Sequence, residues 1–134
     1  MPDTGERLGH YEILDRLGAG GMGEVYRARD TRLDRPVAIK MISQDLQRDP
    51  NAMERFLREA RAVSALNHPN ICALYDVGRA RTGDRSASPA DVDFLVMEFL
   101  EGETLAARLA RGALPVPDAV TVLVVVSSIG FVLV

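Results

Sequence analysis

Short runs of apolar and polar residues, broken by turn-forming residues, open the chain in a pattern typical of β-strands. Three such segments run from Tyr11 to Leu17, from Glu24 to Asp30 and from Pro36 to Ile42. Glycines at 18–23 and a turn-rich stretch at 31–35 separate them. Links this short join strands only in antiparallel order, because parallel pairing needs a long crossover. The first third of the chain therefore predicts an antiparallel meander.

The period changes after the third strand. Apolar residues recur at spacings of three and four, as on one face of a helix, at Met53, Phe56, Leu57, Ala60, Val63 and Leu66. Asp49 followed by Pro50 supplies a cap and a proline at the first helical position. The motif Asn67-His68-Pro69-Asn70 ends the helix, because proline disfavours helix in the residue before it. We therefore expect one long helix over 49–67.

Two more strands and a short helix are expected in the remainder. The strands span Ile71 to Val77 and Asp93 to Phe99, with a polar loop at 79–90 between them, and the helix covers Thr104 to Arg111. This order predicts an α+β fold, a five-stranded antiparallel sheet with one long helix packed on it. We divide the chain into a leader at 1–10, a folded unit at 11–112 and an apolar segment at 113–134.

Composition and charge narrow the functional classes. A chain of 134 residues has room for one domain, and a net charge of -3 argues against nucleic acid as a partner. Cys72 is the only cysteine, which rules out an intrachain disulfide and fits a reducing compartment. The first ten residues are polar and lack the apolar core of a secretory signal. We therefore expect a cytoplasmic protein.

A glycine-rich motif follows the first strand. Residues 18–23, Gly-Ala-Gly-Gly-Met-Gly, fit G-x-G-x-x-G, and glycines let a backbone approach phosphate oxygens closely. By itself the motif also fits a plain hairpin turn. A dinucleotide site would need a helix directly after the glycines, whereas a strand is expected here. A Walker loop would need a G-K-[ST] ending, which is absent.

A valine and a lysine give the glycines a more specific meaning. Val25 and the run Val37-Ala38-Ile39-Lys40 complete the pair G-x-G-x-x-G-x-V and V-A-I-K of the protein-kinase signature. Strand alternation places Ala38, Lys40 and Ile42 on one face. A lysine on such an apolar face either extends to solvent or needs a partner.

Glu59 is the candidate partner of that lysine. On a helical wheel it falls inside the apolar arc, between Val63 and Leu66. A carboxylate on the packed face calls for a cation from the sheet, so we predict a Lys40–Glu59 ion pair. The alternative is a solvated Glu59 at the edge of the arc.

From about Tyr11 to Gly112 the chain resembles the Hanks-type Ser/Thr protein kinases of bacteria. The resemblance rests on LGAGGMGEVYRARD at 17–30, VAIKMI at 37–42, RFLREARAVSALNHPNI at 55–71 and FLVMEFLEGETL at 94–105. It implies the amino-terminal lobe of a kinase, the start of the second lobe, ATP as cofactor and a protein as substrate. The glycine-rich loop, Gly18, Ala19, Gly20, Gly21, Met22 and Gly23, would cover the phosphates. Lys40 would contact the α- and β-phosphates, held by Glu59.

The resemblance also implies an adenine pocket. Leu17, Val25 and Ala38 would enclose the adenine, with Met97 at the gatekeeper position. Glu98 and Leu100 would offer backbone hydrogen bonds to the adenine edge. Cys72 would lie near the back of this pocket, as a plain buried cysteine without a redox role.

Motifs of the second lobe are missing from these 134 residues. Phosphoryl transfer needs the Asp and Asn of H-R-D-x-x-x-x-N and the magnesium-binding Asp of D-F-G, and the sequence contains none of these motifs. Asp76-Val77-Gly78 resembles D-x-G only superficially, and its position predicts a turn. We therefore expect no catalytic residue, no magnesium ligand and no kinase activity from this chain alone.

The last residues depart from the family pattern. Asp118 is followed by AVTVLVVVSSIGFVLV, 16 residues without a charge. As a helix they would span roughly 24 Å, short of the roughly 30 Å of a bilayer core, and their β-branched bias also suits a strand or an aggregating segment. Three interpretations remain: a truncated or frameshifted kinase gene, a pseudokinase-like module that binds a protein partner, or a lobe tethered to a membrane through 119–134.

Overall fold

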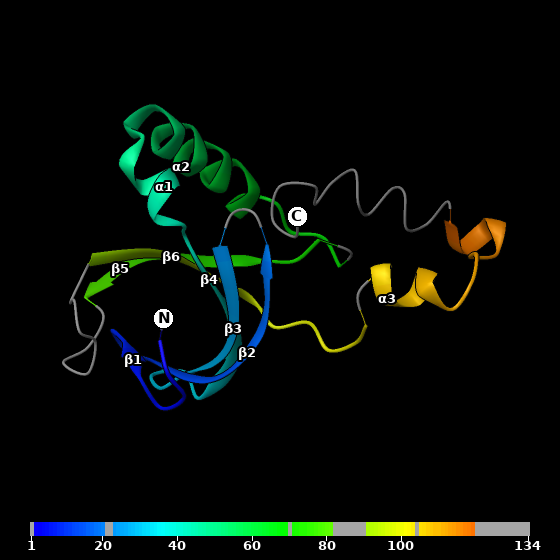
Figure 1. The fold of residues 1–134 in the computed structure, drawn as a ribbon, viewed down its shortest axis with the longest axis horizontal. Helices are drawn as coiled ribbons and strands as arrows, with labels where there is room; N and C mark the ends of the chain where they lie inside the picture. The colour runs from blue at the N-terminus through cyan, green and yellow to red at the C-terminus, as the bar shows by residue number, and fades with distance from the viewer. Residues whose placement is uncertain (1, 21–22, 70, 82–90, 104, 120–134) are drawn as a thin grey trace.

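The computed structural model describes residues 2–20, 23–69, 71–81, 91–103 and 105–119. Within them a single antiparallel sheet has the strand order β1-β2-β3-β4-β6-β5 (Figure 1). The elements follow in chain order as β1 (Arg7–Leu8), β2 (Tyr11–Gly20), β3 (Gly23–Asp30), β4 (Arg35–Met41), α1 (Gln44–Arg48), α2 (Pro50–Ser64), β5 (Leu74–Arg81), β6 (Asp91–Glu98) and α3 (Leu105–Ala110). The expected α+β arrangement is confirmed.

The strand count is a correction, because the sheet has six strands where five were expected. The additional strand, β1, lies in the segment taken as a leader. Leu8 is fully buried there and pairs with Tyr11 of β2. Two residues are too few to show a period, so the sequence pattern could not reveal this strand.

The long helix starts where the sequence indicated. The Asp49 carboxylate accepts hydrogen bonds from the backbone N–H groups of Asn51 and Ala52, at 3.0 and 3.2 Å, and Pro50 occupies the first turn. The helix ends at Ser64, before the expected Asn67. The short helix α1, capped by Ser43, was not predicted.

The turn expected at residues 76–78 is wrong. Asp76, Val77 and Gly78 lie inside β5 and pair with residues 96 to 94 of β6. Gly78 is needed there for packing, because a Cβ atom at this position would lie 2.3 Å from Cζ of the buried Phe94. The residue types suggested a turn, but pairing across the sheet decided the conformation.

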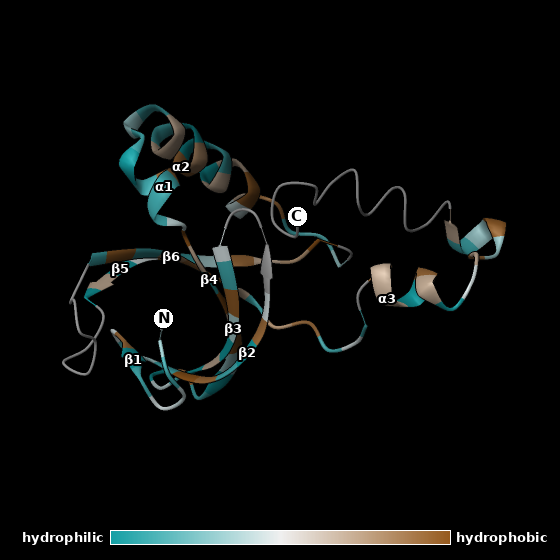
Figure 2. Cartoon of the chain, in the orientation of Figure 1, coloured by the Kyte–Doolittle hydropathy of each residue, from teal (hydrophilic) through white to brown (hydrophobic). Residues whose placement is uncertain are grey.

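Each face of the sheet carries its own hydrophobic core. The inner core, enclosed by the curled sheet, contains Leu8, Tyr11, Ile13, Tyr26, Ala28, Val37, Ile39, Met41, Phe94 and Val96. The helix-side core, toward α2, contains Ala38, Ile42, Phe56, Ala60, Cys72, Leu95 and Met97. Figure 2 shows both hydrophobic and hydrophilic colour along the central strands, and hydrophilic colour over most of α1. Strand β4 thus alternates between the two cores.

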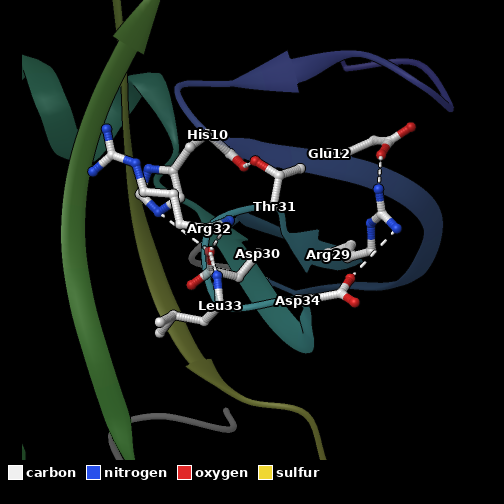
Figure 3. Close-up of polar contacts among 8 residues, drawn as sticks. All are labelled: His10, Glu12, Arg29, Asp30, Thr31, Arg32, Leu33 and Asp34. Carbon is white, nitrogen blue, oxygen red and sulfur yellow. Dashed lines mark hydrogen bonds and ion pairs between the residues drawn. The ribbon is translucent and has the colours of Figure 1, made fainter.

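Polar contacts tie the ends of the curled sheet together. The Tyr11 hydroxyl of β2 donates to Oδ2 of Asp76 in β5 at 3.3 Å, and burial with the nearby Asp76 charge raises the pKa of Tyr11 to about 12. Figure 3 shows a second set at the turn between β3 and β4. There Asp30, almost fully buried, accepts from the N–H groups of Arg32 and Leu33 at 2.9 and 3.1 Å, and His10 Nε2 lies 3.6 Å away.

Candidate nucleotide-binding site

The glycine-rich segment forms the hairpin between β2 and β3. Ala19 pairs with Glu24 and Gly20 with Gly23, while Gly21 and Met22 lie outside the described residues. Gly23 has φ +137°, and a Cβ atom there would lie 1.8 Å from the backbone oxygen of Met41. The hairpin therefore passes directly against the backbone of β4, which only glycine permits.

Lys40 lies in the middle of the sheet, on β4. It pairs with Val25 of β3 on one side and with Leu95 of β6 on the other. Its neighbours on the same face, Ala38 and Ile42, belong to the helix-side core, as the alternation predicted. The residue is only 5% exposed, and burial lowers the pKa of its ammonium below the ordinary value. Lys40 is also the only lysine in the chain.

Glu59 lies on the third turn of α2 and is less buried than predicted. Its side chain is 42% exposed, and its carboxylate lies 4.0 Å from Nε of Arg55, one turn earlier. An exposed ion pair of this kind contributes only about 0.3–0.5 kcal/mol to stability. This is too little to prevent the Glu59 carboxylate from pairing with another cation. The Lys40–Glu59 ion pair stays a prediction.

The residues expected around adenine fall into two groups. Val25, Ala38 and Met97 share the helix-side core, and Ala38 pairs directly with Met97 across the β4–β6 ladder. Leu17 lies apart from them at a shift of register between β2 and β3, where Arg16 faces Tyr26 and Gly18 faces Val25. This irregularity leaves Leu17 as the extra residue of a bulge, and it is 47% exposed.

The chain leaves the sheet just after Glu98. Glu98 is the last residue of β6, and Leu100, two residues on, is 52% exposed. Cys72 is buried behind this segment, and its Sγ donates to the Glu98 carbonyl oxygen at 3.5 Å. Burial, together with the Glu98 charge, raises the pKa of this thiol to about 11. A buried thiol with a raised pKa forms little thiolate at neutral pH.

Ala73 is the residue of this site that the sequence did not suggest. Its N–H donates to Oε2 of Glu98 at 3.2 Å, and its carbonyl accepts from the Glu98 N–H at 2.8 Å. On the Ala73 side, both hydrogen bonds are made by backbone atoms, the N–H and the carbonyl oxygen. Side-chain chemistry therefore gives no signal of this contact in the sequence.

The described residues fit a nucleotide better than they fit a metal ion. The hairpin supplies a closely approaching backbone, Lys40 a buried ammonium, and the residues packed around Met97 an apolar environment. In the part of the chain that the structure describes, no group of three or more His, Cys, Asp or Glu side chains could hold a metal.

Comparison with known proteins defines the class. The family model for the protein kinase domain matches residues 11–128. The chain is 53% identical over 95 residues to the serine/threonine-protein kinase PknB of Mycobacterium leprae, covering 71% of this chain and 14% of that protein. It is 41% identical over 121 residues to the serine/threonine-protein kinase PrkC of Bacillus subtilis, covering 89% of this chain and 17% of that protein.

A solved structure agrees with this class. The Mycobacterium tuberculosis PknI kinase domain superposes with a TM-score of 0.77 at 23% identity, over 98% of this chain and 51% of that chain, which supports the fold. The chain belongs to the protein kinase family and has the fold of its amino-terminal lobe. It spans only about one sixth of the length of the curated relatives named above.

The remaining expectations concern the last residues. The apolar segment predicted to aggregate or to tether the lobe falls mostly at 120–134, outside the described residues, as do Thr104 and most of the loop at 79–90. None of the described helices combines the length and apolar character needed to cross a bilayer.

Proposed function

We propose that this chain binds ATP, with the triphosphate beneath the glycine-rich hairpin and the adenine at the end of β6. The observation that carries the proposal is the burial of Lys40, the only lysine, on the face shared with Ala38 and the hairpin residue Val25. A low local dielectric strengthens the attraction between an ammonium and a phosphate. The backbone of the hairpin adds close-range donors around the same anion.

The same lobe lacks the groups that move a phosphoryl group. A kinase needs an aspartate to accept the substrate proton and further residues to hold magnesium. The sequence has neither H-R-D nor D-F-G. We therefore assign nucleotide binding to these residues and no phosphoryl transfer by them alone. Transfer to a protein serine or threonine, with that protein as second partner, would belong to an enzyme that contains this lobe together with those motifs.

The experiment uses the single lysine. A fluorescent ATP analogue is titrated into the 134-residue chain and into the Lys40→Ala variant, and bound analogue is displaced with ATP. The control, Arg48→Ala, removes one exposed positive charge at the end of α1. Charge-assisted hydrogen bonds contribute about 1.5–3 kcal/mol. Lys40→Ala is therefore expected to lower the affinity for ATP by about tenfold or more.

Chemical labelling gives an independent readout. An adenosine carrying an amine-reactive sulfonyl fluoride has two amines to react with, Lys40 and the amino terminus. Protection of Lys40 by ATP, located by mass spectrometry, would support the site. Equal ATP affinity in the Lys40→Ala and Arg48→Ala variants, with labelling that ATP does not slow, would refute it.

A second role has a specific observation in its favour, the uncharged segment at 119–134. Our primary expectation is a cytoplasmic protein, and the alternative is a lobe held at a membrane. Co-sedimentation with phosphatidylglycerol vesicles that disappears on deletion of 119–134 would support the alternative. A partner-binding role without nucleotide would instead give saturable binding to a protein that ATP does not affect.

A further inference from the structure

The backbone arrangement where β6 ends is unusual for an antiparallel ladder. Ala73 lies just before β5 and faces Glu98, the last residue of β6, next to the paired residues Leu74 and Met97. In an ordinary hydrogen-bonded pair, the two residues exchange both N–H···O=C bonds. Here only one of the two is made, from the Glu98 N–H to the Ala73 carbonyl at 2.8 Å.

The second ladder bond is replaced by a side chain. The Ala73 N–H donates to Oε2 of Glu98 at 3.2 Å, so the carboxylate of Glu98 occupies the place that its own backbone carbonyl would take. The Ala73 donor is satisfied, as a partly buried N–H must be. The consequence is that the Glu98 carbonyl oxygen accepts no backbone hydrogen bond from Ala73 on the β5 side. On its other side Glu98 pairs with Val37 of β4, but the N–H and C=O of one residue in an antiparallel strand point to the same neighbouring strand, here β5.

That carbonyl oxygen retains capacity to accept a hydrogen bond. Cys72 Sγ donates a hydrogen bond to this oxygen at 3.5 Å. A thiol is a weak donor, and a carbonyl oxygen has two lone pairs. The raised pKa of Cys72 keeps this thiol protonated at neutral pH, so it can donate and does not repel an acceptor. The oxygen therefore makes one weak hydrogen bond with Cys72 and keeps a lone pair for a stronger donor.

We propose that the Glu98 carboxylate acts as a positioning residue that frees its own backbone carbonyl for the exocyclic amino group of a purine, which makes it a specificity determinant of the site. The inference rests on the nucleotide-binding function proposed above. It assigns a role to the side chain of Glu98, whereas the resemblance to kinases implied only a role for its backbone. Without the carboxylate, the Ala73 N–H turns to the carbonyl of residue 98 and closes the ladder.

The test compares two nucleotides that differ by one donor. ATP carries the exocyclic amino group, and purine riboside 5′-triphosphate has a hydrogen in its place, with the same triphosphate charge. Their affinity ratio is measured for the wild-type chain and for Glu98→Ala, Glu98→Gln and the control Glu54→Ala, which removes an exposed carboxylate from α2. Changes in net charge cancel in the ratio. Circular dichroism and urea midpoints verify that each variant folds.

A neutral hydrogen bond contributes about 0.5–1.5 kcal/mol, so the wild-type chain is expected to favour ATP by about three- to tenfold. Glu98→Ala is expected to reduce this preference to below about twofold. Glu98→Gln keeps an oxygen for the Ala73 N–H and should retain the wild-type ratio, as should Glu54→Ala. If the Glu98 carboxylate had a purely structural role, Glu98→Ala would lower the affinity for both nucleotides equally and leave their ratio unchanged.

Three results would overturn the inference, and they are distinguishable. If the wild-type chain binds ATP but Glu98→Ala keeps the full preference, the carboxylate does not control the carbonyl, and the proposed function stands. If the wild-type chain binds neither nucleotide, the proposed function fails and the inference fails with it. If Glu98→Ala does not fold, the test rests on Glu98→Gln, which keeps a side-chain oxygen for the Ala73 N–H. Loss of the preference for ATP in a folded Glu98→Gln variant would contradict the role assigned to that oxygen.

Discussion

Two glycines of the same hairpin are expected to respond in opposite ways to an added methyl group. Gly23 has φ +137°, and a Cβ atom there would lie 1.8 Å from the Met41 backbone oxygen. Gly18 has no heavy atom within 4 Å of the corresponding position and no positive φ. Gly23→Ala and Gly18→Ala therefore form a matched pair that differs in local geometry and not in chemistry.

The magnitude follows from three contributions. Replacing glycine by alanine restricts the unfolded chain and stabilises the fold by about 0.4–1 kcal/mol where the conformation permits, as at Gly18. At Gly23 the backbone conformation costs about 1–3 kcal/mol for a residue with a side chain. Moving β3 away from Met41 also weakens at least one ladder bond, at about 1 kcal/mol. Gly23→Ala should thus destabilise by about 2–3 kcal/mol, and Gly18→Ala should be neutral or slightly stabilising.

Urea denaturation followed by far-ultraviolet circular dichroism measures the difference. With a slope of about 1–3 kcal/mol/M for a small domain, Gly23→Ala should lower the midpoint by roughly 1–2 M relative to Gly18→Ala. A Gly23→Ala midpoint within about 0.3 M of the wild-type value would refute the close approach of the hairpin to β4. An equal loss in both variants would instead indicate a general intolerance of this hairpin to side chains.

Further predictions concern the helix cap, pH and the thiol. Asp49→Ala removes the acceptor for two N–H groups of α2 and should lower the free energy of unfolding by about 1 kcal/mol, measured in urea; no change would mean that solvent replaces the cap. Burial by itself would raise the pKa of Asp30, but backbone hydrogen bonds from residues 33 and 32 and the nearby His10 and Arg35 lower it overall. The stability that Asp30 contributes is therefore present above the unfolded pKa of about 3.9 and is lost as pH falls through the folded value, so Asp30→Asn should flatten thermal midpoints measured below about pH 4. An acid response identical in both proteins would contradict this assignment. The Cys72 thiol, with its pKa raised to about 11, should react with an aromatic disulfide far more slowly in the folded chain than in urea, and equal rates would exclude its burial.

The sequence predicted the helices and strands in which apolar residues recur with a regular period over several residues. The alternation at 36–42 placed Ala38 and Ile42 together, and both pack in the helix-side core. The spacing of apolar residues at 53–63 predicted the buried face of α2, where Phe56 and Ala60 are buried. In both segments the period extends over enough residues for the buried face to be recognised from the sequence.

Short elements and backbone contacts could not be predicted in this way. β1 has two residues and α1 has five, too few to establish a period. The segment at 76–78 has turn-forming residue types, but cross-strand pairing with β6 and the ring of Phe94 determine its conformation. The bond between Ala73 and Glu98 depends on a backbone donor that every residue type except proline provides.

The alternation of β4 between two cores also protects the register of the sheet. A shift of one residue would turn every side chain of β4 to the opposite face. Lys40 would then enter the inner core among Ile39's former neighbours, such as Val96 and Tyr26, where an ammonium costs several kcal/mol. Lys40, which we assign to nucleotide binding, therefore also disfavours a shifted strand register. A variant with an apolar residue at position 40 loses the positive charge, and it also loses the energetic penalty against misaligned strands.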